Sequence, residues 1–297
     1  MRLGNAALSH WRYVGKFFWP ADLAVYYPHP GRGLSLGLAA AAGLLLAAVT
    51  ALALALWRRR PWLAAGWLWY VGMLLPMIGL VQFGDLALAD RFTYLPLVGL
   101  ALALVWTARD LCAGQPRCGR VLPAVAVALT CALAALSVTQ LRLWRDSVTL
   151  LGHTLAVTGD NPFVRANLGW SLAGLGRYQE AFRHYQEALR LAPAYAEAHN
   201  NFGVVLARLG RLREAEAEFR EAVRLKPQLA PAWSTLGYAL ARQGRHAEAE
   251  ACYREVLRLE PDNPDAHDNL AELMRAFGRP AEELRHRLEA GRLRSAR

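Results

Sequence analysis

Long uncharged apolar runs alternate with short charged loops through the first half of the chain. The apolar segments lie at residues 33–57, 62–81, 92–108 and 121–141, and none of them contains a charged side chain. A helix needs about 20 apolar residues to cross the roughly 30 Å hydrocarbon core of a bilayer. The pattern therefore predicts four transmembrane helices within residues 33–141, of which the third segment is the shortest.

Residues 1–32, before the first span, carry a different pattern. Arg12 and Lys16 lie off the apolar face of a predicted helix, and that face contains Leu3, Ala7, Trp11, Val14 and Phe18. An amphipathic helix of this kind is typical of segments that lie in the membrane interface. Proline is expected to end the helix at Pro20. A turn then leads into the first span and contains Tyr26, Tyr27, Pro28 and Pro30.

The second half of the chain repeats itself every 34 residues. An apolar residue followed by a small one recurs at Leu168-Gly169, Phe202-Gly203, Leu236-Gly237 and Leu270-Ala271. Aromatic residues recur at Tyr185, Phe219 and Tyr253, and prolines at Pro193, Pro227 and Pro261. The period and these positions match the tetratricopeptide repeat (TPR), in which each unit is a pair of antiparallel helices.

The two halves together predict an all-α fold, with a four-span membrane domain followed by a TPR α-solenoid. Full repeats are expected at residues 162–195, 196–229 and 230–263, and a degenerate polar cap at 264–297. Residues 142–161 are expected to form a linker and one helix of a partial repeat. Stacked repeats create a concave binding surface. We expect the first helix of each repeat to line it.

A row of amides is expected along this groove. The sixth position of the repeats is occupied by Asn167, Asn201, Thr235 and Asn269. An Asn side chain both donates and accepts hydrogen bonds, so such a row can hold the backbone of an extended peptide whatever its sequence. The alternative interpretation is that these residues only cap or bridge neighbouring helices.

Aromatic and basic residues share the expected groove. Trp170 and Tyr238 lie three residues beyond the amide position of their repeats and are candidates for stacking against a ligand. Arg208 and Arg242 occupy matched positions and would favour an acidic peptide. The alternative interpretation for the two arginines is a solvated surface.

The formal net charge of +10 raises the question of nucleic-acid binding. The chain has no zinc-finger spacing, no aromatic RNA-binding motif and no basic helix, so we predict no nucleic-acid partner. Basic loops instead flank the spans, at Arg58-Arg59-Arg60 and at Arg109, Arg117 and Arg120. Because such loops stay in the cytoplasm, the chain is predicted to be a multi-pass protein of the inner (plasma) membrane, with its TPR domain outside the cytoplasm. The cations of residues 1–32 would then also lie outside, against the same rule.

The sequence contains no catalytic-triad arrangement, phosphate-binding glycine loop or metal-ligand spacing. No catalytic residue is identified, and no cofactor or metal is predicted. The segment around Asp90, Arg91 and Tyr94 places charges where the third span begins, and charges at that depth are costly unless they function. Arg91 is a candidate for binding the phosphate of a lipid-linked sugar donor. The alternative is that Asp90 and Arg91 simply cap the helix.

Three segments resemble the C-terminal part of bacterial TPR membrane proteins related to the transmembrane-and-TPR O-mannosyltransferases. They are Tyr13-Val14-Gly15-Lys16-Phe17-Phe18-Trp19-Pro20 with Tyr26-Tyr27-Pro28, then Ala89-Asp90-Arg91-Phe92-Thr93-Tyr94-Leu95-Pro96, and then Trp144-Arg145-Asp146 leading into the repeats. The Asn row is similar to that of the O-linked N-acetylglucosamine transferase superhelix. The resemblance implies a GT-C-type glycosyltransferase that uses a polyprenyl-phosphate sugar while its repeats present the acceptor protein.

In that family, further spans and a catalytic acidic residue in the first external loop precede the region seen here. The chain therefore looks like a fragment, a protein with a mis-assigned start, or a relative without the catalytic half. Two hypotheses stay open. The chain is either the C-terminal part of a protein O-glycosyltransferase or a non-catalytic membrane scaffold. Both make a protein or peptide the partner of the TPR groove, and the first adds a membrane lipid.

Overall fold

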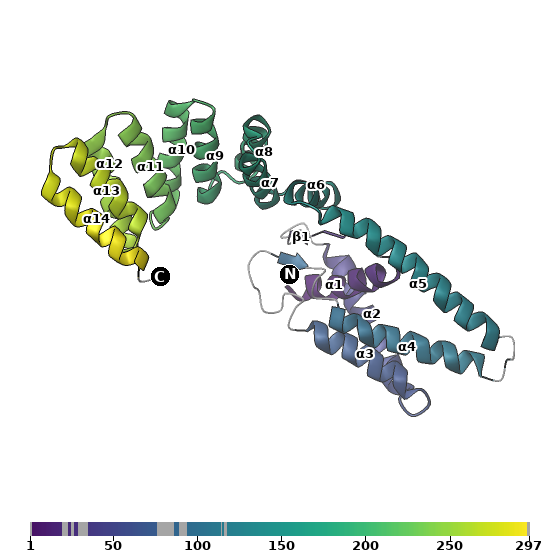
Figure 1. The fold of residues 1–297 in the computed structure, drawn as a ribbon. Coiled ribbons are helices and arrows are strands. Elements are labelled where there is room, and N and C mark those ends of the chain that lie inside the picture. The colour runs from purple at the N-terminus through teal and green to yellow at the C-terminus, as the bar shows by residue number, and fades with distance from the viewer. Residues whose placement is uncertain are drawn as a thin grey trace. The chain divides into compact units, whose positions relative to one another are not determined.

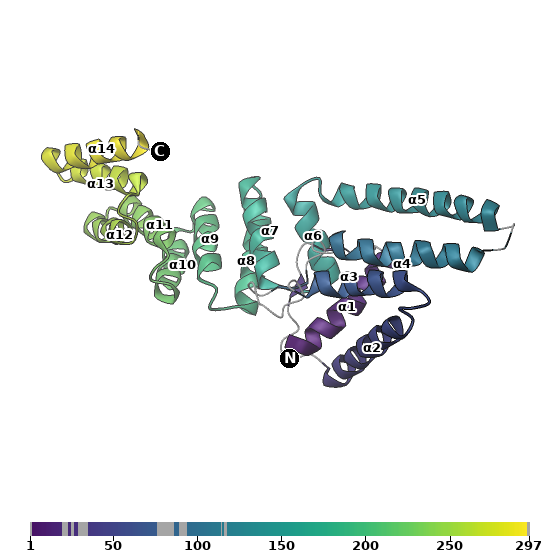
Figure 2. The same cartoon turned by 90° about the horizontal axis from the view of Figure 1, so that it is seen from below.

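The computed structural model describes residues 2–19, 23–24, 27–28, 35–75, 86–88, 94–113, 115 and 118–295. The chain divides into two compact units, Met1–Gly159 and Asp160–Arg297. The ribbons of both units are drawn in Figures 1 and 2.

The first unit is mainly helical. Its helices are α1 (Arg2–Phe18), α2 (Leu36–Ala55), α3 (Pro61–Leu74), α4 (Tyr94–Cys112), α5 (Cys118–Leu143) and α6 (Ser147–Thr158). Two short strands, β1 (Tyr27–Pro28) and β2 (Leu86–Leu88), pair antiparallel. These strands were not predicted, because each is too short to carry an alternating pattern.

Within the described residues, three helices are long and apolar enough to cross a membrane. They are Leu36–Ala55, Leu95–Cys112 and Val121–Leu143, with mean hydropathies of 2.3, 1.5 and 2.3. They correspond to the predicted first, third and fourth spans. The predicted second span, residues 62–81, begins within α3, but α3 has 14 residues. At 1.5 Å per residue it rises only about 21 Å, and residues 76–81 lie outside the described part of the chain.

Helices α3 and α4 pack against each other as an antiparallel hairpin with almost no space between their backbones. A Cβ atom added to Gly66 would clash with the carbonyl oxygen of Gly99, and the reverse also holds. Small residues of this kind allow close helix packing in membranes. Trp69 Nε1 donates to the Leu95 carbonyl at 2.9 Å near one end. At the other end, Arg60 and Asp110 form an ion pair at 3.0 Å.

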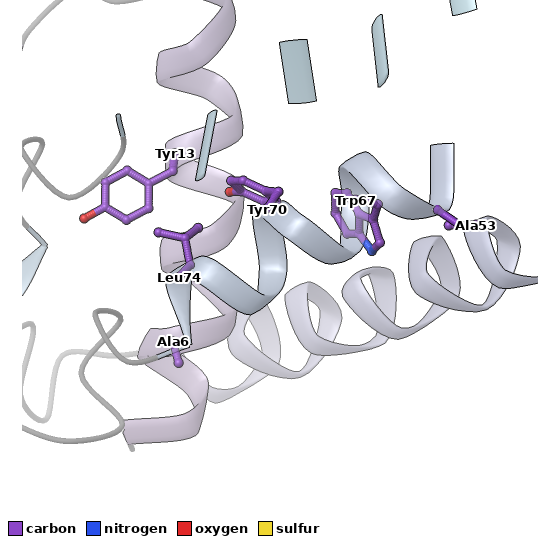
Figure 3. Packing of buried hydrophobic residues seen from close by; sticks show 7 residues of the cluster. Ala6, Tyr13, Ala53, Trp67, Tyr70 and Leu74 are labelled. Atoms are coloured by element: carbon purple, nitrogen blue, oxygen red, sulfur yellow. The ribbon is translucent and has the colours of Figure 1, made fainter. Parts of the chain in front are cut away.

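Helix α1 packs into the core of this unit (Figure 3). The core cluster consists of Ala6, Tyr13, Ala53, Ala64, Trp67, Tyr70 and Leu74. The Tyr70 hydroxyl donates to the His10 carbonyl at 2.5 Å, and Trp11 Nε1 donates to the Ala42 carbonyl at 3.0 Å. These contacts attach α1 to α2 and α3.

The face of α1 that is buried against protein differs from the predicted apolar face. Asn5, Ser9 and His10 are almost fully buried, whereas Leu3 and Phe18 are 75% and 62% exposed. The predicted apolar face is divided, because Trp11 and Val14 pack against the core cluster. The helix therefore presents polar side chains to the protein and some apolar ones outward. Of the predicted turn, Tyr26 and Pro30 lie outside the described residues.

The second unit consists of helix pairs that follow one another along the chain. The helices are α7 (Pro162–Gly174) and α8 (Tyr178–Leu191), α9 (Ala196–Arg208) and α10 (Leu212–Leu225), α11 (Ala230–Arg242) and α12 (His246–Leu259), and α13 (Pro264–Ala276) and α14 (Pro280–Ser295). The second helix of each pair also packs against the first helix of the next, as Figures 1 and 2 show. The turn inside each pair contains a glycine with φ between 67° and 78°, at Gly176, Gly210, Gly244 and Gly278. Only glycine adopts this left-handed conformation without steric cost.

The recurring small and aromatic residues meet inside each helix pair. A Cβ atom added to Gly203 would lie 2.5 Å from Cε1 of Phe219, and one added to Gly237 would lie 2.8 Å from Cε1 of Tyr253. Gly169 and Tyr185 make the same contact in the first pair. The glycines therefore let the two helices approach, and the aromatic ring fills the space between them.

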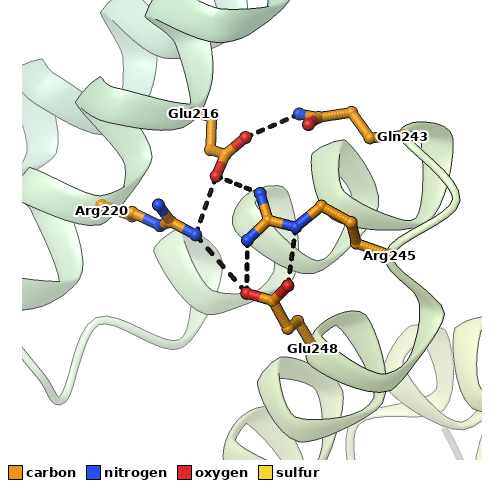
Figure 4. Close-up of polar contacts among 5 residues, drawn as sticks. All are labelled: Glu216, Arg220, Gln243, Arg245 and Glu248. Atoms are coloured by element: carbon orange, nitrogen blue, oxygen red, sulfur yellow. Dashed lines mark hydrogen bonds and ion pairs between the residues drawn. The ribbon is translucent and has the colours of Figure 1, made fainter.

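A buried carboxylate joins the second and third helix pairs (Figure 4). Glu216 on α10 is 8% exposed. It accepts hydrogen bonds from Gln243 Nε2 at 2.9 Å and Arg245 Nη1 at 2.6 Å, and it forms an ion pair with Arg220 at 2.8 Å. Burial alone would raise the pKa of Glu216. The hydrogen bonds from Gln243 and Arg245 and the neighbouring cations outweigh burial and lower it.

Candidate functional site

The first helices of the first two repeats border an open pocket of about 300 Å³. Its lining consists of Ala166, Asn167, Trp170, Tyr195, Ala198 and Asn201. Three of the residues that the sequence suggested, Asn167, Trp170 and Asn201, are thus brought together between α7 and α9. Both amides are half-buried, and the Trp170 side chain is 58% exposed.

The hydrogen bonds of the two amides decide which atoms a ligand would meet. Asn167 Nδ2 donates to the Phe163 carbonyl of its own helix at 2.8 Å. Asn201 Oδ1 accepts from Asn200 Nδ2 at 3.2 Å. The Asn167 oxygen is therefore the group best placed to accept from a ligand, and the Asn201 nitrogen the group best placed to donate.

Tyr185 lies inside the first helix pair, behind the pocket-lining helix α7. Its buried hydroxyl has no hydrogen-bond partner among the described residues. Burial raises the pKa of Tyr185.

At the equivalent place between the second and third repeats, a hydrogen bond between side chains joins the two first helices. Thr235 Oγ1 donates to Asn200 Oδ1 at 2.6 Å and so joins α11 to α9. Asn200 is 8% exposed and also donates to Asn201. Between these two repeats, Thr235 of the polar row bridges neighbouring helices, which is the alternative interpretation given above. The sequence patterns did not indicate Asn200, Ala166, Tyr195 or Ala198, although the 34-residue register places Asn200 and Ala166 at the same position.

Tyr238 and Arg242 lie together on α11. Arg242 Nη1 donates to the Tyr238 hydroxyl at 3.1 Å, and its guanidinium carbon lies 5.9 Å from the ring centroid. Tyr238 is 55% exposed. Arg208 lies at the end of α9, seven residues beyond Asn201. Seven residues are nearly two helical turns, so Arg208 lies on the same face about 10 Å further along.

The fourth helix pair has a different character from the others. Asn269 is half-buried on α13. Asp265 and Asp268 on the same helix both form ion pairs with Arg294 of α14, the first at 3.2 Å. The first helix of this pair therefore carries these two carboxylates, and Arg294 of the same pair neutralises part of their charge.

The predicted lipid-phosphate residues are not brought into a described site. Asp90 and Arg91 lie outside the described residues. Tyr94 is the first residue of α4, but its side chain is not described.

Comparison with known proteins supports the repeat assignment. Tetratricopeptide repeat family models match residues 167–230 and 230–263. The second half of the chain therefore contains TPR units, as the 34-residue period predicted.

The curated relatives are much longer than the part that this chain matches. The chain is 33% identical over 130 residues to the protein O-mannosyl-transferase Tmtc2 of Drosophila melanogaster, which covers 43% of this chain and 13% of that protein. It is also 33% identical over 138 residues to the protein O-mannosyl-transferase TMTC1 of Mus musculus, covering 46% and 15%. Both matches fall on the TPR region.

Solved structures of MamA are also similar. One crystal structure of MamA matches with a TM-score of 0.47 and 18% identity, over 50% of this chain and 87% of that chain. MamA from Desulfovibrio magneticus RS-1 matches with a TM-score of 0.46 and 21% identity, over 50% and 85%.

Proposed function

We propose that this TPR-containing chain is a membrane-anchored protein whose groove binds an extended segment of a protein or peptide. The observation that carries the proposal is the pocket between α7 and α9, because it combines two amides with an exposed tryptophan. A shallow groove with a few positioned polar groups and an apolar wall is what recognition of an extended chain requires.

The two amides suit a peptide backbone. The Asn167 oxygen would accept from a ligand N–H, and the Asn201 nitrogen would donate to a ligand carbonyl. Each such bond contributes about 0.5–1.5 kcal/mol. Neither bond depends on the side chains of the ligand. In a right-handed superhelix of stacked repeats, Asn269 would extend the same row to the fourth helix pair.

We further propose that residues 1–141 form a four-span membrane domain, with an interfacial α1 and a second span that continues from α3. The TPR domain would then lie outside the cytoplasm in an inner-membrane, multi-pass protein. The Arg60–Asp110 ion pair supports this arrangement, because it places the two basic loops that we assign to the cytoplasm at the same end of the α3–α4 hairpin.

The chain is proposed to be the C-terminal part of a GT-C-like protein O-glycosyltransferase. Support comes from the sequence resemblance and from relatives that are named protein O-mannosyl-transferases. In such an enzyme the groove would hold the acceptor, and Asp90, Arg91 and Tyr94 would lie near the phosphate of a polyprenyl-phosphate sugar. The alternative is a non-catalytic scaffold. It is favoured by the fact that the matches to those relatives fall on the repeats alone.

The binding proposal is tested with the full chain in lipid nanodiscs. A displayed library of random dodecapeptides is selected on the wild type and on a variant that combines Asn167→Ala, Asn201→Ala and Asn269→Ala. The matched control replaces exposed glutamines of α8 in the same way, with Gln179→Ala and Gln186→Ala. We expect enrichment on the wild type and the control but not on the triple variant. Equal enrichment on all three would reject the amide row.

A further inference from the structure

In the pocket between α7 and α9, the first repeat has a small residue, Ala166, where the second repeat has an amide, Asn200. Asn200 fills its position and accepts a hydrogen bond from Thr235 across the step between α9 and α11. Ala166, 34 residues earlier, has no side chain that reaches across the corresponding step between α7 and α9. Ala166 therefore leaves the first step without the side-chain bridge that Asn200 makes at the second.

The walls of this pocket suit one flat ring. Ala166 and Ala198, which are 6% and 1% exposed, supply small apolar surfaces. Trp170 and Tyr195 supply aromatic surfaces, and the two amides supply polar ones. A volume of about 300 Å³ is at the small end for ligand pockets. Aromatic side chains prefer edge-to-face or offset packing on other rings, and a tyrosine also carries a hydroxyl that seeks a polar partner.

The charges along the groove indicate which residues accompany the ring in the ligand. Most arginines on the second helices form ion pairs within the repeats, such as Arg190 with Glu187 and Arg258 with Glu255. Among residues 160–295, neither Arg208 nor Arg242 has a carboxylate within ion-pair distance, and Arg242 contacts Tyr238 instead. Both lie two turns beyond the amide position on neighbouring first helices, so their charges are available to an acidic ligand.

From these observations we infer that the pocket anchors one aromatic side chain, with tyrosine as the best fit, of an extended peptide that also carries acidic residues. The inference rests on the proposed peptide-binding function and adds the chemical class of the ligand. The ring would lie between Trp170 and Tyr195, its hydroxyl near the amides of Asn167 and Asn201. The acidic residues would reach Arg208 and Arg242.

The test uses the variant Ala166→Asn, which installs at the first step the side chain that the second step already accommodates as Asn200. Random dodecapeptides displayed on phage are selected on the full chain in nanodiscs, in parallel for the wild type, Ala166→Asn and the control Ser234→Asn. Ser234 occupies the same position in the third repeat. The best peptide is then labelled with fluorescein, and its affinity is measured by anisotropy with its aromatic residue intact or replaced by alanine.

We expect the wild type and Ser234→Asn to enrich peptides that combine an aromatic residue with Asp or Glu, and Ala166→Asn to lose the aromatic preference. Replacing the aromatic residue should weaken binding to the wild type by about tenfold, the equivalent of 1.4 kcal/mol, and leave binding to Ala166→Asn unchanged. Enriched peptides without an aromatic preference would overturn this inference and leave the peptide-binding function standing. If neither chain enriches any peptide beyond the triple Asn→Ala variant, both fail.

Discussion

His199 and Glu218 are joined by a hydrogen bond of 2.6 Å between Nδ1 of the imidazole and Oε2 of the carboxylate. The other ring nitrogen, Nε2, lies 2.9 Å from the Pro193 carbonyl. Both neighbours are acceptors, so the doubly protonated imidazolium satisfies both contacts. Burial would lower the pKa of His199, but the bonds to Glu218 and Pro193 outweigh burial and raise it above 6.5.

A raised pKa in the folded state makes the second repeat less stable in alkali. The contribution of His199 is fully present below the unfolded pKa of about 6.5 and is lost as the pH rises through the higher folded value. We expect a loss of up to about 1 kcal/mol, because the pair is partly exposed. Thermal unfolding of the full chain, followed from pH 6 to pH 9, measures it.

The matched variant is His199→Trp. Trp233, at the same position of the next repeat, donates Nε1 to the Pro227 carbonyl at 2.8 Å. A tryptophan at position 199 should therefore keep the bond to Pro193 and remove the titration. We expect the difference in unfolding temperature between wild type and variant to change with pH. A constant difference would show that His199 does not titrate in this range.

The second prediction concerns the contact between Gly203 and Phe219. Gly203→Ala places a methyl group 2.5 Å from the ring, and overpacking of this kind costs about 1–3 kcal/mol. Gly174→Ala is the control, because a Cβ atom there meets nothing within 4 Å. Alanine should stabilise that helix position by roughly 0.5–1 kcal/mol. Urea unfolding of both variants measures the two effects, and equal stabilities would contradict the packing described above.

The third prediction concerns the α3–α4 hairpin. Gly66→Leu should separate the helices, because even a Cβ atom at Gly66 meets the Gly99 backbone. Gly72→Leu, on the same helix, meets open space and serves as control. We expect the first variant to aggregate at a lower temperature in detergent, measured by size exclusion after heating, and the control to match the wild type. If both variants behave alike, the close packing of Gly66 against Gly99 is wrong.

The repeat half was largely predictable because its signals are local and periodic. The glycine–aromatic pairs, such as Gly203 with Phe219, recur every 34 residues, and the same contact recurs in the structure. The first half was less predictable. Hydrophobicity identifies apolar segments, but it does not distinguish lipid from protein as the neighbour. This is why the buried polar face of α1, with Asn5 and His10, was missed.

The candidate site was predictable only in part. Periodicity identified the amide row, but not that Asn200 and Thr235 bridge one pair of first helices while Ala166 lines a pocket at another. That difference depends on how far side chains reach between helices of neighbouring repeats. The 34-residue register aligns Ala166 with Asn200, but it does not give the distance from either residue to the neighbouring first helix.

The last prediction concerns the side of the membrane on which the repeats lie. With the basic loops in the cytoplasm, the TPR domain is outside, and so are the cations of residues 1–32. In the structure, Tyr27 reduces this disagreement with the rule for one of these cations, Lys16. Its ammonium group hydrogen bonds to the Tyr27 hydroxyl and lies 3.8 Å from the ring centroid, so protein groups compensate part of the charge.

Cysteine labelling decides between the two orientations. In a chain whose native cysteines are replaced by serine or alanine, Gln228→Cys marks an exposed turn between repeats and Arg59→Cys marks the loop before α3. A membrane-impermeant maleimide should label Gln228→Cys in intact spheroplasts and Arg59→Cys only after the membrane is opened. The opposite pattern would place the groove in the cytoplasm, where a lipid-linked sugar donor on the outer face of the membrane does not meet it. That opposite labelling pattern would therefore also contradict the glycosyltransferase proposal. It would be compatible with the scaffold alternative and with peptide binding in the groove.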